Sequence, residues 1–78
     1  MEQLMEIFKE MYPDECVTSD KRLIDEGILT SLDIVGLIAD IDDVFGVRIP
    51  AHKITPENFN SPSDIYALIQ SLQRNNEL

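Results

Sequence analysis

The chain has 78 residues, enough for one small domain with a thin hydrophobic core. Fifteen Asp and Glu residues oppose six Lys and Arg residues, so the formal charge is −9. This acidity excludes the basic footprint that nucleic acids require, disfavours an anionic membrane surface and favours partners that carry a basic patch. The single cysteine, Cys16, cannot form an internal disulfide, which predicts a reducing, cytoplasmic environment.

No repeat, low-complexity tract or linker interrupts the sequence, so residues 1–78 are expected to form a single domain. The longest apolar run, residues 34–39, is bounded by Asp33 and Asp40 and is far shorter than the roughly 20 residues of a bilayer span. The acidic first dozen residues lack the positive charge and apolar run of a signal peptide. We therefore expect no membrane insertion.

An amphipathic helix is predicted over the first dozen residues. Its apolar positions recur at helical spacing: Met1, Leu4, Met5, Phe8, Met11 and Tyr12. Pro13 should end it, because the residue before a proline is pushed out of the α region. Residues 13–29 then form a long connection, from which four apolar side chains are expected to reach the core: Leu23, Ile24, Ile28 and Leu29.

A second helix is predicted to begin at Thr30 or Ser31, because Thr30 and Asp33 have the spacing of a capping box. Its expected core stripe is Ile34, Leu37, Ile38, Ile41, Val44 and Phe45. Gly46 follows at the position where a left-handed residue commonly ends a helix.

The remaining elements are predicted from proline and serine positions. Residues 47–50 should be extended, and a helical turn over 55–59 should have Pro56 at its first position. The last helix should begin with Ser61 as N-cap, followed by Pro62 and by Asp64 two residues later. Its expected core stripe is Ile65, Leu68, Ile69 and Leu72, and residues 74–78 should fray. The expected fold is all-α: a small bundle of three principal helices plus one short helix, with a long first loop.

The second helix has more apolar surface than one core stripe requires. Leu32, Val35 and Ala39 lie away from the stripe on a helical wheel, beside a line of mostly acidic positions: Asp33, Gly36, Asp40 and Asp43. This pattern predicts a docking face for a basic partner. Alternatively, Leu32 and Val35 bury against the 13–29 loop and the aspartates form a solvated face.

Other candidate sites have weaker support. A serine at a helix start, such as Ser31, is usually a cap, and no neighbouring residue would make its hydroxyl nucleophilic. His52 stands beside Lys53 in an expected polar loop, and neither it nor Cys16 has partners for a catalytic site. The aspartates of residues 40–43 fail the calcium-loop pattern, because Val44 and Phe45 stand where a ligand and the glycine belong. No metal site is therefore predicted.

Three segments together resemble acyl and peptidyl carrier proteins: Leu-Ile-Asp-Glu-Gly-Ile-Leu-Thr-Ser-Leu-Asp-Ile-Val-Gly-Leu-Ile over residues 23–38, Phe-Gly-Val-Arg-Ile-Pro over 45–50, and Asn-Ser-Pro-Ser-Asp-Ile over 60–65. The resemblance covers nearly the whole chain, and its most specific element is Ser-Leu-Asp at 31–33. It implies the acyl-carrier bundle, with 4′-phosphopantetheine attached covalently to Ser31. The attached arm would hold an acyl or aminoacyl group as a thioester, and the carrier itself would not be an enzyme.

The resemblance also implies partners. A phosphopantetheinyl transferase would modify Ser31, a ligase would load the acyl or aminoacyl group, and downstream transferases or synthases would receive it. These enzymes would meet a monomeric carrier through basic docking patches. On the carrier, the implied contacts are the second-helix residues Thr30, Leu32, Asp33, Val35, Gly36, Ala39, Asp40 and Asp43.

Two positions depart from the family pattern. Thr30 stands where the family usually has aspartate, and Gly36 stands where glutamate is common. The segment 53–62 resembles D-alanyl carrier proteins of cell-wall polymer modification, whereas residues 27–35 look closer to acyl carriers of fatty-acid or polyketide pathways. Because Thr30 removes a carboxylate that a standard transferase would meet, an unmodified interaction domain of the same fold remains an alternative.

Overall fold

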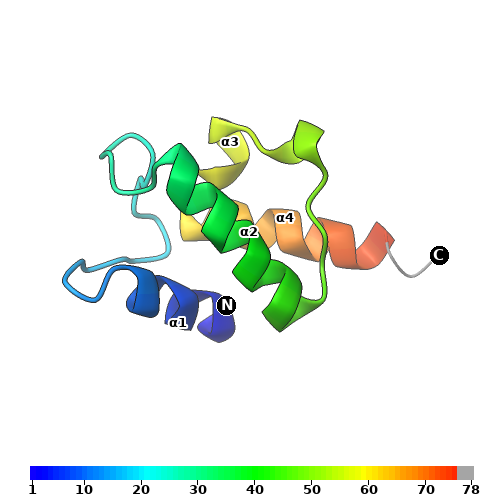
Figure 1. The fold of residues 1–78 in the computed structure, drawn as a ribbon, viewed down its shortest axis with the longest axis horizontal. Helices are drawn as coiled ribbons and strands as arrows, with labels where there is room; N and C mark the ends of the chain where they lie inside the picture. Colours follow the sequence, from blue (N-terminus) through cyan, green and yellow to red (C-terminus); the bar gives the residue numbers. More distant parts are fainter. Residues whose placement is uncertain (76–78) are drawn as a thin grey trace.

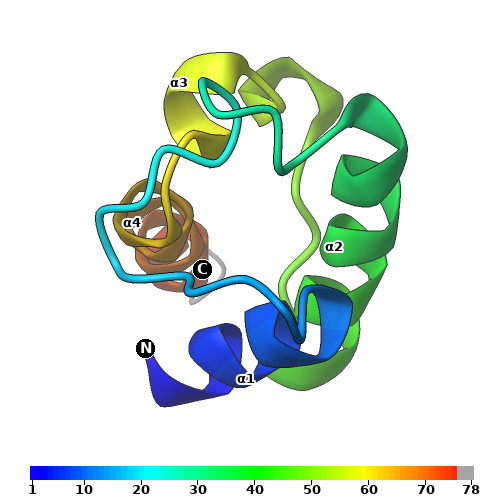
Figure 2. The same ribbon diagram turned by 90° about the vertical axis from the view of Figure 1, so that its left-hand side faces the viewer.

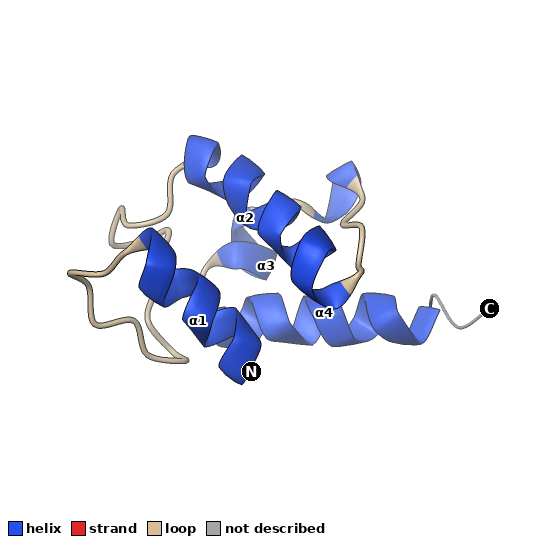
Figure 3. Ribbon diagram, turned by 60° about the horizontal axis from the view of Figure 1, so that its bottom comes forward, coloured by secondary structure: helices blue, strands red, loops and turns tan. Residues whose placement is uncertain are grey.

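Helices make up most of the described part of the chain. The computed structural model describes residues 1–75 and contains α1 (Glu2–Met11), α2 (Ser31–Phe45), the 3-10 helix η1 (Ala51–Lys53), α3 (Pro56–Phe59) and α4 (Pro62–Asn75). Residues 1–75 contain no strand, which confirms the all-α prediction (Figure 3). α1, α2 and α4 surround a common centre, and the long first loop crosses one end of the bundle (Figures 1 and 2).

Every α-helix and the first loop contribute to one hydrophobic core. Its fully buried apolar side chains include Leu4, Phe8, Leu23, Leu37, Ile41, Phe59, Ile65 and Ile69. Leu23 and Leu29 of the first loop are buried, and Ile24 and Ile28 pack partly against the same cluster. The four predicted loop anchors are thus confirmed, and they hold an otherwise irregular segment against the helices.

The buried face of α1 differs from the predicted stripe. Ile7, which the stripe omitted, is buried together with Leu4 and Phe8, whereas Met1 and Met5 are only partly buried. The reason is that α1 contacts both α2 and α4, so its buried arc is centred between these two neighbours. The predicted end is correct: Tyr12 follows the last helical residue, and its N–H donates to the carbonyl of Phe8.

α2 begins and ends as predicted, with Thr30 as N-cap and Gly46 at a left-handed φ of 66°. Leu37 and Ile41 are fully buried. Val44 was expected in the core and is instead 43% exposed. It borders a surface cavity that is lined by Ile7 and by three polar side chains of α1, Gln3, Glu6 and Glu10, so its outer side faces mostly polar groups.

The C-terminal half confirms the predicted starts of both later helices. Pro56 is the first residue of α3, and the Ser61 hydroxyl accepts the N–H of Asp64 at 3.2 Å at the start of α4. The turn η1 was not expected, since residues 51–53 read as a polar loop. α4 continues to Asn75, so residues 74–75 of the tail expected to fray are helical, and residues 76–78 lie outside the described part.

Candidate functional site

The first turn of α2 presents Ser31 at the surface. The Oγ1 of Thr30 accepts the N–H of Asp33 at 3.3 Å, and Oδ2 of Asp33 accepts the N–H of Thr30 at 3.4 Å. This reciprocal pair is the predicted capping box. Thr30, not Ser31, is therefore the cap, and the exposed Ser31 hydroxyl has no hydrogen-bond partner within residues 1–75.

A second interaction ties this turn to α1. The hydroxyl of Tyr12 donates a 2.9 Å hydrogen bond to Oδ2 of Asp33. This bond lowers the pKa of the Asp33 carboxyl below its ordinary value, although partial burial acts in the opposite direction. Burial and, after it, the same hydrogen bond raise the pKa of the Tyr12 phenol well above its ordinary value. At neutral pH Asp33 is thus charged and Tyr12 is neutral.

Two backbone amides at this end of α2 remain for an external group. The first four N–H groups of an α-helix have no partner inside the helix. The capping box takes those of Thr30 and Asp33, which leaves the N–H groups of Ser31 and Leu32. Together with the dipole of the 15-residue helix, these amides favour an anion attached at Ser31.

The outer face of α2 carries apolar side chains that its own fold leaves uncovered. Leu32 is 84% exposed and Val35 is 67% exposed. The alternative in which both bury against the first loop is therefore wrong. Gly36, Ala39, Asp40 and Asp43 are exposed as well, while Asp33 is half-buried because it contacts Tyr12. The helix thus brings most of the predicted docking residues to one exposed side of the molecule, along the turns that follow Ser31.

The other titratable candidates lie elsewhere. Cys16 is exposed in the first loop, and His52 is exposed in η1. Within residues 1–75, no group of three His, Cys, Asp or Glu side chains is placed to hold a metal ion. Two surface cavities, of about 290 and 310 Å³, lie along α1, and neither includes a residue of the first turn of α2. No helix within residues 1–75 is long and apolar enough to cross a membrane.

Two residues make long-range contacts that the sequence does not indicate, one at this site and one with the first loop that leads to it. The helical spacing places Tyr12 only in the apolar stripe of the first helix, and no pattern indicates a role for Asn60. Both act on residues distant in sequence: Tyr12 bonds to a residue 21 positions away, and Asn60 bonds to residues 35 and 36 positions away. No local spacing could have indicated either contact.

Comparisons with known proteins agree with the geometry. Residues 2–69 match the family described as phosphopantetheine attachment site. The D-alanyl carrier protein of Streptococcus equi subsp. zooepidemicus is 29% identical over 73 residues, which cover 92% of each chain. Aminoacyl carrier protein 1 of Bradyrhizobium diazoefficiens is 38% identical over 55 residues, covering 70% of this chain and 60% of that protein.

A solved structure shares the arrangement of helices. A chain in the crystal structure of Bradyrhizobium japonicum glycine:[carrier protein] ligase, complexed with its cognate carrier protein and an analogue of glycyl adenylate, superposes with a TM-score of 0.69. It is 31% identical in sequence, and the match covers 90% of both chains. With the family match extending over most of the sequence, the protein belongs to the phosphopantetheine-attachment family of carrier proteins, which carry 4′-phosphopantetheine on a serine and are generally substrates of other enzymes.

Proposed function

We propose that Ser31 is the attachment serine and that the chain carries an amino acid, as a thioester, between partner enzymes. The observation that carries this assignment is the state of the Ser31 hydroxyl. It is exposed at the first position of α2, while Thr30 and Asp33 do the capping that a serine at a helix start usually does. The hydroxyl is therefore free to be modified without loss of the cap.

The residues around Ser31 fit a phosphodiester. The N–H groups of Ser31 and Leu32 have no hydrogen-bond partner within residues 1–75, so they and the positive end of the α2 dipole would be available to a phosphate attached there. The Asp33 carboxylate, the nearest negative charge in the turn, is engaged by Tyr12 and by the Thr30 amide. Phosphopantetheine on Ser31 would supply the thiol that holds the cargo. In the transfer from coenzyme A, the Ser31 oxygen would bond to the phosphorus that carries pantetheine, the pyrophosphate bond would break and 3′,5′-ADP would leave. The hydroxyl proton would pass to a base of the modifying enzyme.

An amino acid is the favoured cargo because of the relatives. They are named D-alanyl carrier protein and aminoacyl carrier protein, and the structural match comes from a complex with a glycine:[carrier protein] ligase. The same resemblance supports partner enzymes of two kinds, a phosphopantetheinyl transferase and an aminoacyl-loading ligase. Both would approach the face of α2 that exposes Leu32 and Val35 beside acidic side chains, so a basic, partly apolar docking surface is expected on each.

An intact mass measurement tests the attachment site. The chain is incubated with coenzyme A, magnesium and a promiscuous phosphopantetheinyl transferase, in parallel with Ser31→Ala and Ser63→Ala. Ser63 is a matched control, since it is also exposed in the first turn of a helix, α4. We expect one phosphopantetheine on the wild-type chain and on Ser63→Ala, and none on Ser31→Ala. An unmodified but helical wild-type chain would favour the interaction domain that needs no modification.

The cargo has its own test. The chain is isolated from the cells that produce it, and the group released from the thiol by hydroxylamine is identified by mass. An amino acid hydroxamate is the expected product. A fatty-acid or polyketide hydroxamate would leave the carrier function intact and contradict the amino acid assignment.

A further inference from the structure

Asn60, at the junction of α3 and α4, is hydrogen-bonded to the first loop through both its side chain and its backbone. Its Oδ1 accepts the N–H groups of Ile24 and Asp25, each at 3.2 Å. Its Nδ2 donates to Oδ2 of Asp25 at 3.1 Å, and its backbone carbonyl accepts the N–H of Leu23 at 2.6 Å. Asn60 thus accepts the backbone N–H groups of three consecutive loop residues, Leu23, Ile24 and Asp25.

These contacts continue towards Ser31. The carbonyl of Leu23, whose amide Asn60 holds, accepts the N–H groups of Ile28 and Leu29 at 2.8 and 3.0 Å. Leu29 is buried and directly precedes the capping residue Thr30. Hydrogen bonds therefore connect the α3–α4 junction to Leu29 through the turn formed by residues 23–29, and the chain itself joins Leu29 to Thr30 at the start of α2.

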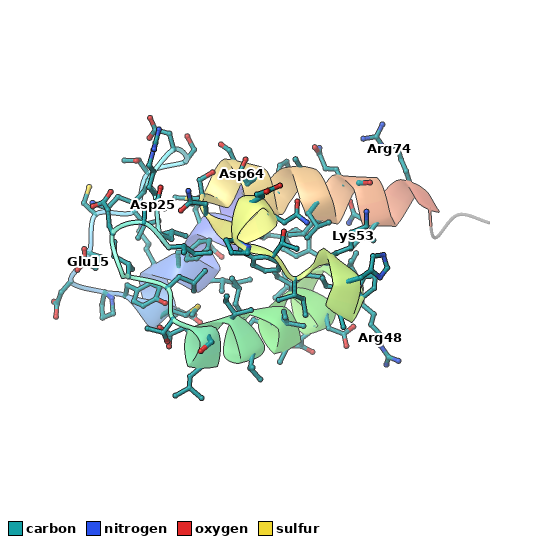
Figure 4. The ribbon with its side chains drawn as sticks, turned by 90° about the horizontal axis from the view of Figure 1, so that it is seen from above. Glu15, Asp25, Arg48, Lys53, Asp64 and Arg74 are labelled. Carbon is teal, nitrogen blue, oxygen red and sulfur yellow. The ribbon has the colours of Figure 1, made fainter. Side chains whose placement is uncertain are left out.

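Apolar anchors hold the two ends of this turn in the core, and the contacts of Asn60 add polar attachment at Ile24 and Asp25. The turn has no helix or strand, and Asp25, Glu26 and Gly27 are exposed. α4 itself contributes a backbone bond to the loop, from the N–H of Ser63 to the carbonyl of Ser19. Figure 4 shows Asp25 on the first loop, at the opposite end of the molecule from Arg74 of α4.

From these contacts we propose that Asn60 is a positioning residue for Ser31. It fixes the turn of residues 23–29 beside the first turn of α2, so that an enzyme approaching Ser31 meets one fixed surface made of the loop and the helix. This role rests on the proposed attachment of phosphopantetheine to Ser31. Asn60 itself does not touch the reacting atoms, and it acts only through the loop.

Asn60→Ala tests the proposal, and Asn58→Ala is the matched control. Asn58 lies two residues earlier and also donates a side-chain hydrogen bond, at 2.8 Å, but to the carbonyl of Lys53 and not to the first loop. Two quantities are measured on chains shown to be folded. One is amide hydrogen exchange at Ile24 and Asp25, and the other is kcat/KM for phosphopantetheine transfer, with kcat and KM separated.

For Asn60→Ala we expect exchange at the amides of Ile24 and Asp25 to accelerate about tenfold or more relative to the core amides. We also expect kcat/KM to fall about tenfold, mainly through KM, because the approach surface is no longer held in one arrangement. Asn58→Ala should change kcat/KM less than about twofold. If Asn60 had a purely structural role, kcat/KM of each variant would fall in proportion to its loss of stability.

If Asn60→Ala does not fold, the donor and acceptor groups of Asn60 and Asp25 can be exchanged instead. Asn60→Asp keeps an acceptor for the two amides but places a carboxylate beside that of Asp25, so kcat/KM should fall at neutral pH. Adding Asp25→Asn returns a donor opposite that carboxylate and should restore kcat/KM. No rescue, or equal rates for wild type and Asn60→Ala, would overturn the positioning role alone. A wild-type chain that is not modified at Ser31 would overturn the proposed function as well.

Discussion

The hydroxyl of Tyr12 lies 2.9 Å from Oδ2 of Asp33, and this hydrogen bond joins the end of α1 to the first turn of α2. The same Asp33 oxygen accepts the N–H of Thr30, so one carboxylate closes the capping box and fixes the neighbouring helix. Ser31 lies between Thr30 and Asp33 in the sequence. The orientation of its turn is therefore set both by local capping and by a contact with a distant helix.

Tyr12→Phe removes the hydroxyl and leaves the ring. We expect a loss of about 1 kcal/mol in the free energy of unfolding at neutral pH, because the half-buried Asp33 carboxylate loses a charge-assisted donor. Urea unfolding monitored by circular dichroism measures this loss. An unchanged midpoint would contradict a contribution of the Tyr12–Asp33 bond to stability.

The same variant should also alter the pH dependence of stability. The folded state lowers the pKa of Asp33, so its contribution is present above the ordinary pKa of an aspartate, about 4, and is lost as the pH falls through the folded value. The folded state raises the pKa of Tyr12, so stability should decline as the pH rises above about 10. Both slopes should flatten in Tyr12→Phe, which unfolding curves at several pH values would show.

Gly36 has no structural requirement to be glycine. It is exposed within α2, and a Cβ placed on it would have no atom within 4 Å. Gly36→Ala should therefore raise the free energy of unfolding by about 1 kcal/mol. Gly36→Glu should raise the free energy of unfolding by about 0.2–0.5 kcal/mol less than Gly36→Ala does. The reason is repulsion from Asp33 and Asp40, which lie three and four residues away on the same face. Thermal unfolding of the two variants would test this order, and a lower Tm for Gly36→Ala would contradict it.

The exposed apolar side chains of α2 are expected to act in docking and not in stability. Val35→Ala and Val44→Ala make the same change on the same helix, at residues 67% and 43% exposed. Val35→Ala should leave stability within about 0.5 kcal/mol but lower kcat/KM for phosphopantetheine transfer about fivefold. Val44→Ala should lower stability more and the transfer rate less. The reverse pattern would place the docking surface on the side of α2 nearest α1.

Local signals in the sequence predict where the helices begin and end, whereas the burial of individual side chains depends on long-range contacts. Thr30 with Asp33, Ser61 with Asp64, and the left-handed Gly46 all lie within four residues of the helix end they determine. The burial of Ile7 and the exposure of Val44 depend instead on which helices are neighbours, which the helical period of one segment does not specify.

The candidate site divides in the same way. Ser31, Leu32 and Val35 follow from the phase of a single helix, so their exposure could be predicted. The contacts of Tyr12 and Asn60 could not, since each requires two segments to meet at a specific height and angle in the folded chain. Asparagine and tyrosine at these positions are also compatible with a simple helix end or core stripe.

The acidic charge should make the fold more stable at high salt. Against a formal charge of −9, the described residues form only two ion pairs, Lys21–Glu26 at 3.1 Å and Arg22–Asp25 at 3.7 Å. Raising the salt from about 0.01 to 1 M shortens the screening length from about 30 to 3 Å, which weakens repulsion among exposed carboxylates. We expect Tm to rise by about 5 °C, corresponding to about 1 kcal/mol.

Asp43→Asn is the variant that connects this effect to specific residues. Asp42 and Asp43 lie in the last turn of α2, which has no basic residue, and the negative end of the helix dipole disfavours carboxylates there. Asp43→Asn should therefore add about 0.3–1 kcal/mol at low salt and reduce the increase of Tm with salt. Asp20→Asn, a change of equal charge in the first loop outside any helix, is the control and should stabilise less. Equal gains for both variants would indicate that net charge alone, and not its position on α2, determines the effect of salt.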